Sequence, residues 1–308
     1  MSSNINPRVD LAFKKIFGVE ENKDLLISLI NSIVSEEDQV EEVTLLNPYN
    51  FQSFKGDKLS IPDIKASGTN GKRFNIEIQI SDEADYDKRA LYYWAKLYTE
   101  QLKVTQDYST LSKAIGIHIL NFTSIPHSAK YHNKFRLAEK ETNLEYFKDL
   151  ELHTIELKKF TDNPNEELPD IIAKVKNSLD IWITFLTRHD LLNKDNLPKE
   201  LNSKSLKKAL GVLEVMSFTE EERMAYDDHL KYLQMEASAI KKAAMDAREE
   251  GREEGREEGI EIGREEGEKA KAMAMAKKML AKGKTIDEII EFTELTKAEI
   301  KNLQTQNP

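Results

Sequence analysis

The segment 72–81 alternates strictly between apolar and polar side chains, and this pattern restricts the fold more than any other. Its apolar members are Phe74, Ile76, Ile78 and Ile80, and its polar members are Asn75, Glu77, Gln79 and Ser81. Because successive side chains of a strand point to opposite faces, one face of this strand is apolar and the other polar. The segment 58–66 precedes it across SGTNG, whose residues tolerate positive φ. We therefore expect an antiparallel hairpin whose apolar face must be covered.

The hydrophobic pattern around this hairpin predicts an α/β fold. Apolar residues at helical spacing predict helices at 7–18, 22–34 and 85–104, and apolar or alternating runs predict strands at 41–48, 114–122 and 153–157. We expect Asn6 to cap the first helix, and Leu91 and Trp94 of the third to face the core. Elements in this order indicate a mixed central sheet flanked by helices.

The C-terminal half of the chain has a different pattern. It is helical in character from Pro164 to about 236, and glycine then recurs every fourth residue among Glu and Arg, at Gly251, Gly255, Gly259, Gly263 and Gly267. Two capping boxes follow, at Thr285–Glu288 and Thr296–Glu299. We expect three parts: a core at 1–160, a helical extension at 161–236, and a charged glycine-repeat helix with a small helical C-terminal unit at 237–308.

The glycine repeat has two interpretations. Each glycine costs about 1 kcal/mol relative to alanine within a helix, which favours a solvated and partly frayed linker. On a helix, however, the glycines also form one slowly drifting stripe, which would admit the backbone of a partner helix. The second interpretation predicts a homo-oligomer formed through the C-terminal tail.

Composition excludes several classes of protein. The chain has no cysteine, which excludes disulfide scaffolds, thiol nucleophiles and zinc sites with sulfur ligands. No apolar stretch approaches the length of a membrane span and the start lacks a signal peptide, so we expect a cytoplasmic protein without membrane contact. The net charge of −10 is spread evenly. Nucleic acid would therefore need a local cleft, helped by a divalent cation that offsets the negative charge.

Two carboxylates carry the chemistry that the hairpin predicts. Asp63 follows Pro62 on the first strand, and the short connection can bring it near Glu77 on the second. Two such carboxylates repel each other and favour a divalent cation between them. The alternative is an ordinary half-exposed strand with no functional role.

Several motifs together resemble one nuclease superfamily. Pro62-Asp63 followed by Glu77-Ile78-Gln79 resembles the PD-(D/E)XK nucleases, with glutamine in place of the usual lysine. Further motifs resemble the recombination-promoting nuclease and transposase branch: DLAFKKIFG at 10–18, RALYY at 89–93 with Tyr98, Gln101 and Tyr108, the glycine-repeat tail, and TIDEIIEFTELTKAEI at 285–300. The resemblance touches nearly the whole chain, and the combination is more specific than any single motif.

The resemblance implies a restriction-endonuclease-like fold and a Mg²⁺-dependent DNA endonuclease, with Mn²⁺ as a substitute ion, that promotes recombination or transposition. It implies that Asp63 and Glu77 hold the ion, with Asp10 of the first helix completing the site. Gln79 would stand where a lysine orients the nucleophile. We expect little sequence specificity, because no rich base-reading surface is evident.

The sequence is also consistent with other roles for Gln79, Asp63, Glu77 and Asp10. Glutamine brings no positive charge, so the second hypothesis is a catalytically weak or inactive DNA-binding or oligomerising module of the same fold. A protein-interaction scaffold would require Asp63 and Glu77 to lie apart. Asp10 is equally consistent with an acidic residue placed favourably in the first turn of a helix.

Four further residues are candidates for binding DNA phosphates. Arg89 and Tyr93 share a helical face, together with Lys96, directly after the strand that bears Glu77. Lys65 lies two residues after Asp63 on the same face of the first strand, and Lys14 lies on the first helix. The alternatives are an Arg89–Asp85 ion pair and simple solvation of the two lysines.

Overall fold

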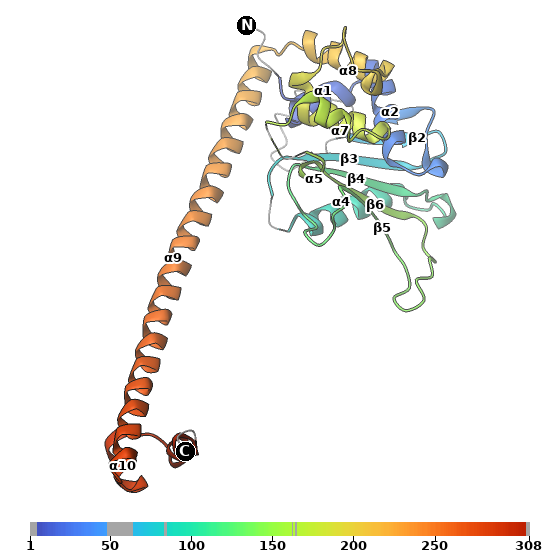
Figure 1. The fold of residues 1–308 in the computed structure, drawn as a ribbon. Helices are drawn as coiled ribbons and strands as arrows, with labels where there is room; N and C mark the ends of the chain where they lie inside the picture. Colours follow the sequence, from blue (N-terminus) through green and yellow to red (C-terminus); the bar gives the residue numbers. More distant parts are fainter. Residues whose placement is uncertain (1–4, 48–63, 83–84, 162, 164, 306–308) are drawn as a thin grey trace. The chain divides into compact units, whose positions relative to one another are not determined.

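The computed structural model describes residues 5–47, 64–82, 85–161, 163 and 165–305. Its centre is a six-stranded sheet with strand order β1-β2-β3-β4-β6-β5 (Figure 1). The strands are β1 (Val43–Leu45), β2 (Ile64–Gly68), β3 (Arg73–Gln79), β4 (Ala114–Leu120), β5 (His132–Arg136) and β6 (Leu150–Glu156). The β3–β4 and β4–β6 pairs are parallel and the other pairs are antiparallel. This mixed sheet with flanking helices confirms the expected fold class.

Helices cover both faces of the sheet. One face carries α1 (Asp10–Phe17), α2 (Lys23–Ile33), α7 (Ser178–Arg188) and α8 (Lys204–Val215), and the other carries α4 (Tyr86–Thr99) (Figure 1). The alternating apolar residues of β3, such as Phe74 and Ile76, are fully buried in one core with α1, α2, α7 and α8. The alternation that predicted the strand is therefore explained by this layered packing.

The remaining helices follow the sheet in the chain. They are α5 (Leu157–Phe160), α6 (Leu168–Ile172), α9 (Glu220–Ala281), α10 (Ile286–Thr293) and α11 (Lys297–Thr305), and short 3₁₀ turns include η2 (Glu36–Asp38) and η4 (His189–Leu191). No described helix combines the length and the apolar character that crossing a membrane requires.

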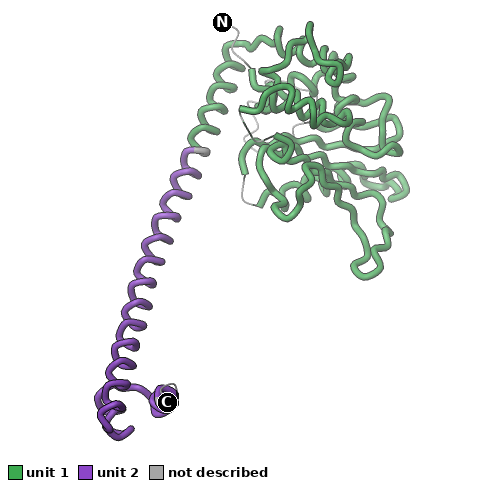
Figure 2. Tube along the Cα trace, in the orientation of Figure 1, with its two compact units in different colours: residues 1–236 green, residues 237–308 purple. Residues whose placement is uncertain are grey.

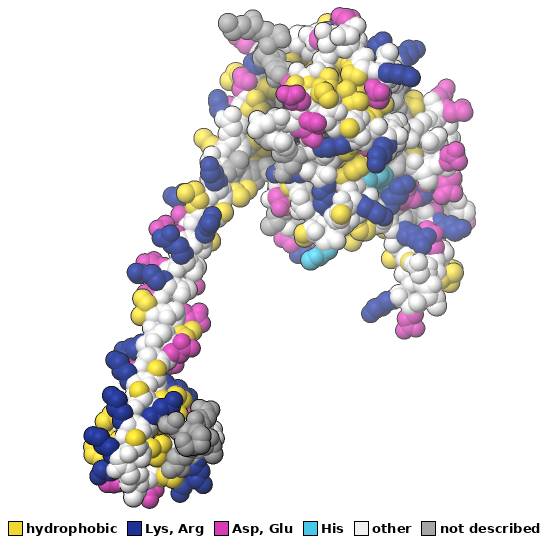
Figure 3. All heavy atoms as spheres, viewed as in Figure 1, with side chains coloured by type: hydrophobic (Ala, Val, Ile, Leu, Met, Phe, Trp, Pro, Cys, Tyr) yellow, Lys and Arg dark blue, Asp and Glu magenta, His cyan; other side chains and the backbone are white. Residues whose placement is uncertain are grey.

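The chain divides into two compact units, residues 1–236 and 237–308 (Figure 2). The second unit ends in a small apolar core to which Ala276, Ile289, Leu295, Ile300 and Leu303 contribute. Both expected capping boxes are present, because Thr285 exchanges hydrogen bonds with Glu288 and Thr296 with Glu299. On the face of the first unit seen in Figure 3, acidic and basic side chains are interspersed.

Two expectations about the elements were wrong, and one strand was missed. Helix α1 starts at Asp10 with Val9 as its N-cap, and Asn6 instead accepts a hydrogen bond from the Arg8 backbone. Leu91 in α4 is 50% exposed, because the buried face of α4 is formed by Tyr86, Ala90 and Leu97. Strand β5 was not expected at all, since it is an edge strand with mostly exposed residues and no apolar alternation.

Candidate active site

Glu77 lies in the middle of β3, at the centre of the sheet. The parallel register places it beside His118 of β4, on the face that α4 covers. The polar face of β3 is therefore not solvent-exposed: Glu77 is only 6% exposed, and its neighbour Asn75 is fully buried. Burying a carboxylate is costly unless other polar groups compensate, so the environment of Glu77 sets its chemistry.

Two polar groups lie next to the Glu77 carboxylate, and a third lies next to one of them. Asn75 Nδ2 donates a hydrogen bond to Oε1 at 3.1 Å, and His118 Nδ1 lies 3.7 Å from Oε2. The Tyr86 hydroxyl from α4 lies 2.8 Å from the same His118 nitrogen. Burial acts to raise the pKa of Glu77, but His118, Asn75 and Arg89 outweigh it and lower the pKa below its ordinary value. Glu77 is thus a buried carboxylate that stays ionised at neutral pH.

Gln79 shares this face and is joined to α4. Arg89 Nη2 donates a hydrogen bond to Gln79 Oε1 at 2.8 Å, and the Arg89 guanidinium lies 5.1 Å from the centroid of the Tyr86 ring. The structure therefore brings three of the expected site residues together: Glu77, Gln79 and Arg89. A positive charge stands next to the glutamine, although it comes from another element.

The other expected site residues make different contacts. Asp10 Oδ1 lies 3.0 Å from Lys14 Nζ, one helical turn away in α1. Lys65 Nζ pairs with Glu100 at 2.8 Å, after the end of α4. Tyr93 is half-buried in α4, with its ring edge-on to Tyr92. Lys14 and Lys65 thus each have a carboxylate partner, and their role as DNA contacts stays a prediction.

Asp63 lies outside the described residues. The described pairing of β2 with β3 ends at Ile64 opposite Ile76, directly before Asp63 in the chain. Among the described residues, no group of three His, Asp or Glu side chains could hold a metal ion. The donor chemistry of Glu77 fits a divalent cation all the same, because it is an ionised oxygen ligand of the kind that Mg²⁺ prefers.

His118 is the neighbour that the sequence did not reveal. None of the six histidines shows metal-binding spacing, and His118 lies within an apolar strand, so it resembles a core residue. Its position beside Glu77 depends on the parallel register of β3 and β4. Gly116 leaves room for it, since a Cβ at position 116 would lie 3.0 Å from His118 Nε2 and 2.6 Å from Leu152 Cδ2.

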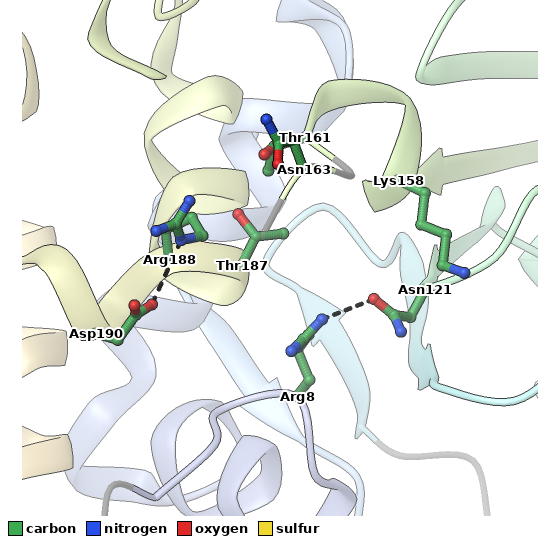
Figure 4. A pocket seen from close by; sticks show the side chains of 8 residues that line it. All are labelled: Arg8, Asn121, Lys158, Thr161, Asn163, Thr187, Arg188 and Asp190. Atoms are coloured by element: carbon green, nitrogen blue, oxygen red, sulfur yellow. Dashed lines mark hydrogen bonds and ion pairs between the residues drawn. The ribbon is translucent and has the colours of Figure 1, made fainter. Parts of the chain in front are cut away.

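A second polar feature lies at the carboxyl ends of β4 and β6. It is a pocket of about 310 Å³ lined by Arg8, Asn121, Lys158, Thr161, Asn163, Thr187, Arg188 and Asp190 (Figure 4). Asn121 directly follows β4, and its backbone N–H donates a hydrogen bond to the Gln79 carbonyl at 2.9 Å. The pocket thus adjoins the end of the strand that bears Glu77. Sequence reasoning missed it because its residues come from distant segments.

Comparison with known proteins is consistent with this geometry. The family model described as PD-(D/E)XK nuclease family transposase matches residues 7–243. That range includes the whole sheet, Glu77, Gln79 and the pocket residues. No curated protein and no solved structure matches the chain.

Proposed function

Since the chain belongs to the PD-(D/E)XK nuclease family transposases, we propose that it is a divalent-metal-dependent DNA endonuclease. The substrate is the phosphodiester backbone of DNA, cut with low sequence specificity during recombination or transposition. The observation that carries the proposal is the buried, ionised carboxylate of Glu77 in the central strand, with Gln79 and Arg89 beside it.

The acidic residues would hold the metal ion. Glu77 provides one carboxylate, Asp63 is assigned the second, and Asp10 is assigned a supporting place from α1. When bound, Mg²⁺ or Mn²⁺ would polarise the phosphoryl oxygen and lower the pKa of a coordinated water. Asn75 and His118 keep the Glu77 carboxylate oriented and ionised before DNA arrives.

Gln79 and Arg89 together take the place of the usual lysine. A lysine would both orient the attacking water and offset developing negative charge. The Gln79 amide is positioned by its hydrogen bond from Arg89, and Arg89 brings the charge that glutamine lacks. In this assignment Tyr93, Lys65 and Lys14 contribute secondary phosphate contacts.

Two further assignments complete the proposal. The five glycines of α9 form a stripe on which two copies of the chain associate, so the enzyme acts as a homo-oligomer on both DNA strands. The second candidate function is a catalytically weak DNA-binding module of the same fold, and the glutamine at position 79 favours it.

Nicking of supercoiled plasmid tests the function. The intact protein is expected to nick DNA with Mg²⁺ and not with EDTA. Glu77→Gln and Asp63→Asn should each lower the rate by about 100-fold or more, because each removes charge from the metal site. Glu200→Gln, which changes an exposed carboxylate in the helical region, is the matched control and should keep the wild-type rate.

Each other outcome has a definite meaning. Nicking that persists at the wild-type rate in Glu77→Gln would remove the proposed site. DNA binding without nicking by the wild-type protein, with both Mg²⁺ and Mn²⁺ tried, would favour the binding module.

A further inference from the structure

The pocket of Figure 4 has an excess of positive charge. Its lining includes the cationic side chains Arg8, Lys158 and Arg188 against a single carboxylate, Asp190. The chain as a whole carries a net charge of −10, so this pocket is a local exception to the acidic balance. Such a concave cationic site attracts anions.

Arg8 is bonded only to neutral groups among the described residues. Its Nη1 donates a hydrogen bond to Asn121 Oδ1 at 2.7 Å, and its Nε donates to Asn6 Oδ1 at 3.3 Å. Burial lowers the pKa of Arg8, and Asp190 opposes that effect only in part. A half-buried guanidinium held in place by amides is preorganised for an anion that supplies the missing charge.

The other two cationic side chains of the pocket, Lys158 and Arg188, are also available to bind an anion. The Lys158 side chain is exposed and has no hydrogen bond or ion pair with any residue that the structure describes. Arg188 donates a hydrogen bond to the Glu166 carbonyl, and its Nε lies 3.6 Å from Asp190 Oδ1. Thr161 and Thr187 add hydroxyl groups to the lining, which can donate to anionic oxygens.

We propose that this pocket binds a phosphate of the DNA that reaches the Glu77 site. The inference rests on the proposed function and adds a binding position for the substrate: Arg8, Lys158 and Arg188 hold one backbone phosphate of the bound DNA. The link is the backbone hydrogen bond from Asn121 to the Gln79 carbonyl, which joins the pocket wall to the end of β3. Ligands of open α/β sheets gather at the carboxyl ends of parallel strands, where this pocket lies.

The salt dependence of DNA binding tests the proposal without requiring cleavage. Fluorescence anisotropy of a labelled duplex, measured in EDTA between 50 and 200 mM salt, gives the slope of log affinity against log salt. Each phosphate contact contributes about 0.9 to this slope. Lys158→Gln should lower the slope by about 0.9 and weaken binding several-fold at low salt.

Matched variants distinguish the effect of losing a positive charge from the effect of disturbing the fold. Arg8→Lys should keep the slope, whereas Arg8→Gln should lower it by about 0.9. Lys207→Gln, an exposed lysine of α8, is the control and should leave the slope unchanged. A duplex with 5′-phosphates and one with 5′-hydroxyls distinguish the source: a change with both indicates a backbone phosphate, and a change only with the first indicates a terminal phosphate.

The possible failures are distinguishable. Because the Lys158 side chain is exposed and makes no hydrogen bond or ion pair with a described residue, Lys158→Gln tests the pocket even if Arg8→Gln does not fold. An unchanged slope in folded Lys158→Gln, with DNA binding and nicking intact in the wild type, would overturn the pocket alone. Absence of DNA binding by the wild type would overturn both the pocket and the proposed function.

Discussion

On the proposed assignment, Arg89 supplies the positive charge that a glutamine at position 79 lacks. The glutamine occupies the strand position two residues after Glu77, and the guanidinium of Arg89 reaches it from α4 at 2.8 Å. If the pair acts as the equivalent of one lysine, removal of the charge at position 89 should be compensated by a charge at position 79. This is a stronger expectation than loss of activity alone, since many substitutions in a site reduce activity.

We therefore expect Arg89→Gln to lower the metal-dependent nicking rate by about 10- to 100-fold, because it removes positive charge beside the reacting phosphate. Adding Gln79→Lys to Arg89→Gln should recover at least part of that loss. Single-turnover nicking at saturating DNA measures both effects. Lys88→Gln, an exposed position of the same helix, is the control. A double variant no faster than Arg89→Gln would contradict the pairing.

At the scale of residues, the sequence predicted part of this arrangement. Strand alternation predicted that Glu77 and Gln79 share one face, which the structure confirms, and their catalytic roles and that of Arg89 stay predictions. The Arg89 hydrogen bond to Gln79 could not be predicted, because it depends on how α4 is set against the sheet. His118 was missed for a similar reason: only the parallel register of β3 and β4 brings it to Glu77.

At the scale of elements, a network of charged and polar side chains connects several strands of the sheet away from the candidate active site. His132 Nε2 of β5 lies 2.9 Å from His153 Nδ1 of β6, and His153 Nε2 lies 2.6 Å from Glu151. Lys113 then bridges Glu151 and Asp38, at 2.6 Å from each. This network links η2, the start of β4, and the strands β5 and β6 at the edge of the sheet.

This arrangement shifts the titration of its members. Burial, with His153 and Lys134 adding to it, lowers the pKa of His132 to about 4. The hydrogen bond from His153, with Lys113 adding to it and burial opposing, lowers the pKa of Glu151 to about 2. Between pH 6.5 and about 4 the unfolded chain therefore binds a proton at His132 that the folded chain does not.

Acidification in this range should lower the free energy of unfolding. The variant His132→Gln keeps an amide donor toward His153. Its free energy of unfolding should fall between pH 6.5 and 4.5 by about 1 to 2 kcal/mol less than that of the wild type. Urea unfolding at several pH values measures it. Part of the dependence will remain, because burial also lowers the pKa of His189 to about 4. The exposed His127→Gln is the control, and a variant curve parallel to the wild type would contradict the assignment.

The elements themselves were predicted unevenly. Strands β3 and β4 were found with nearly correct bounds, because their apolar runs are long and buried on at least one face. The face of α4 was misjudged, since Leu91 and Ala90 are neighbours and only packing decides which one is buried. Strand β5 has the exposed composition of a loop and takes its conformation from pairing with β6.

At the scale of the whole molecule, the glycines of the α9 repeat are exposed, and the space that a side chain would occupy at each of them is empty within the described chain. Apart from its chain neighbours and the adjacent turns of its own helix backbone, a Cβ built at Gly251, Gly255, Gly259, Gly263 or Gly267 would meet no atom within 4 Å. Nothing inside the described chain therefore explains five small residues at this spacing. A second copy of the chain is the partner that we propose for this stripe.

Substitution of the stripe tests that proposal in the full-length protein. Gly255→Leu with Gly259→Leu should convert a dimer into a monomer in light scattering, because two large side chains block close approach of the helices. Glu253→Leu with Glu257→Leu, which adds the same side chains off the stripe, should leave the mass unchanged. A monomeric wild-type protein, or equal masses for all three proteins, would contradict the proposal.

The positions of the pocket residues in the sequence also determine the order in which the two sites are completed during synthesis. During synthesis Glu77 and Gln79 emerge early, whereas Arg188 and Asp190 emerge only after every strand of the sheet has been made. A nascent chain therefore contains Glu77 and Gln79 before it contains the residues that complete the pocket with Arg8. On this assignment, the phosphate-binding pocket is completed only once most of the first unit, residues 1–236, has been synthesised.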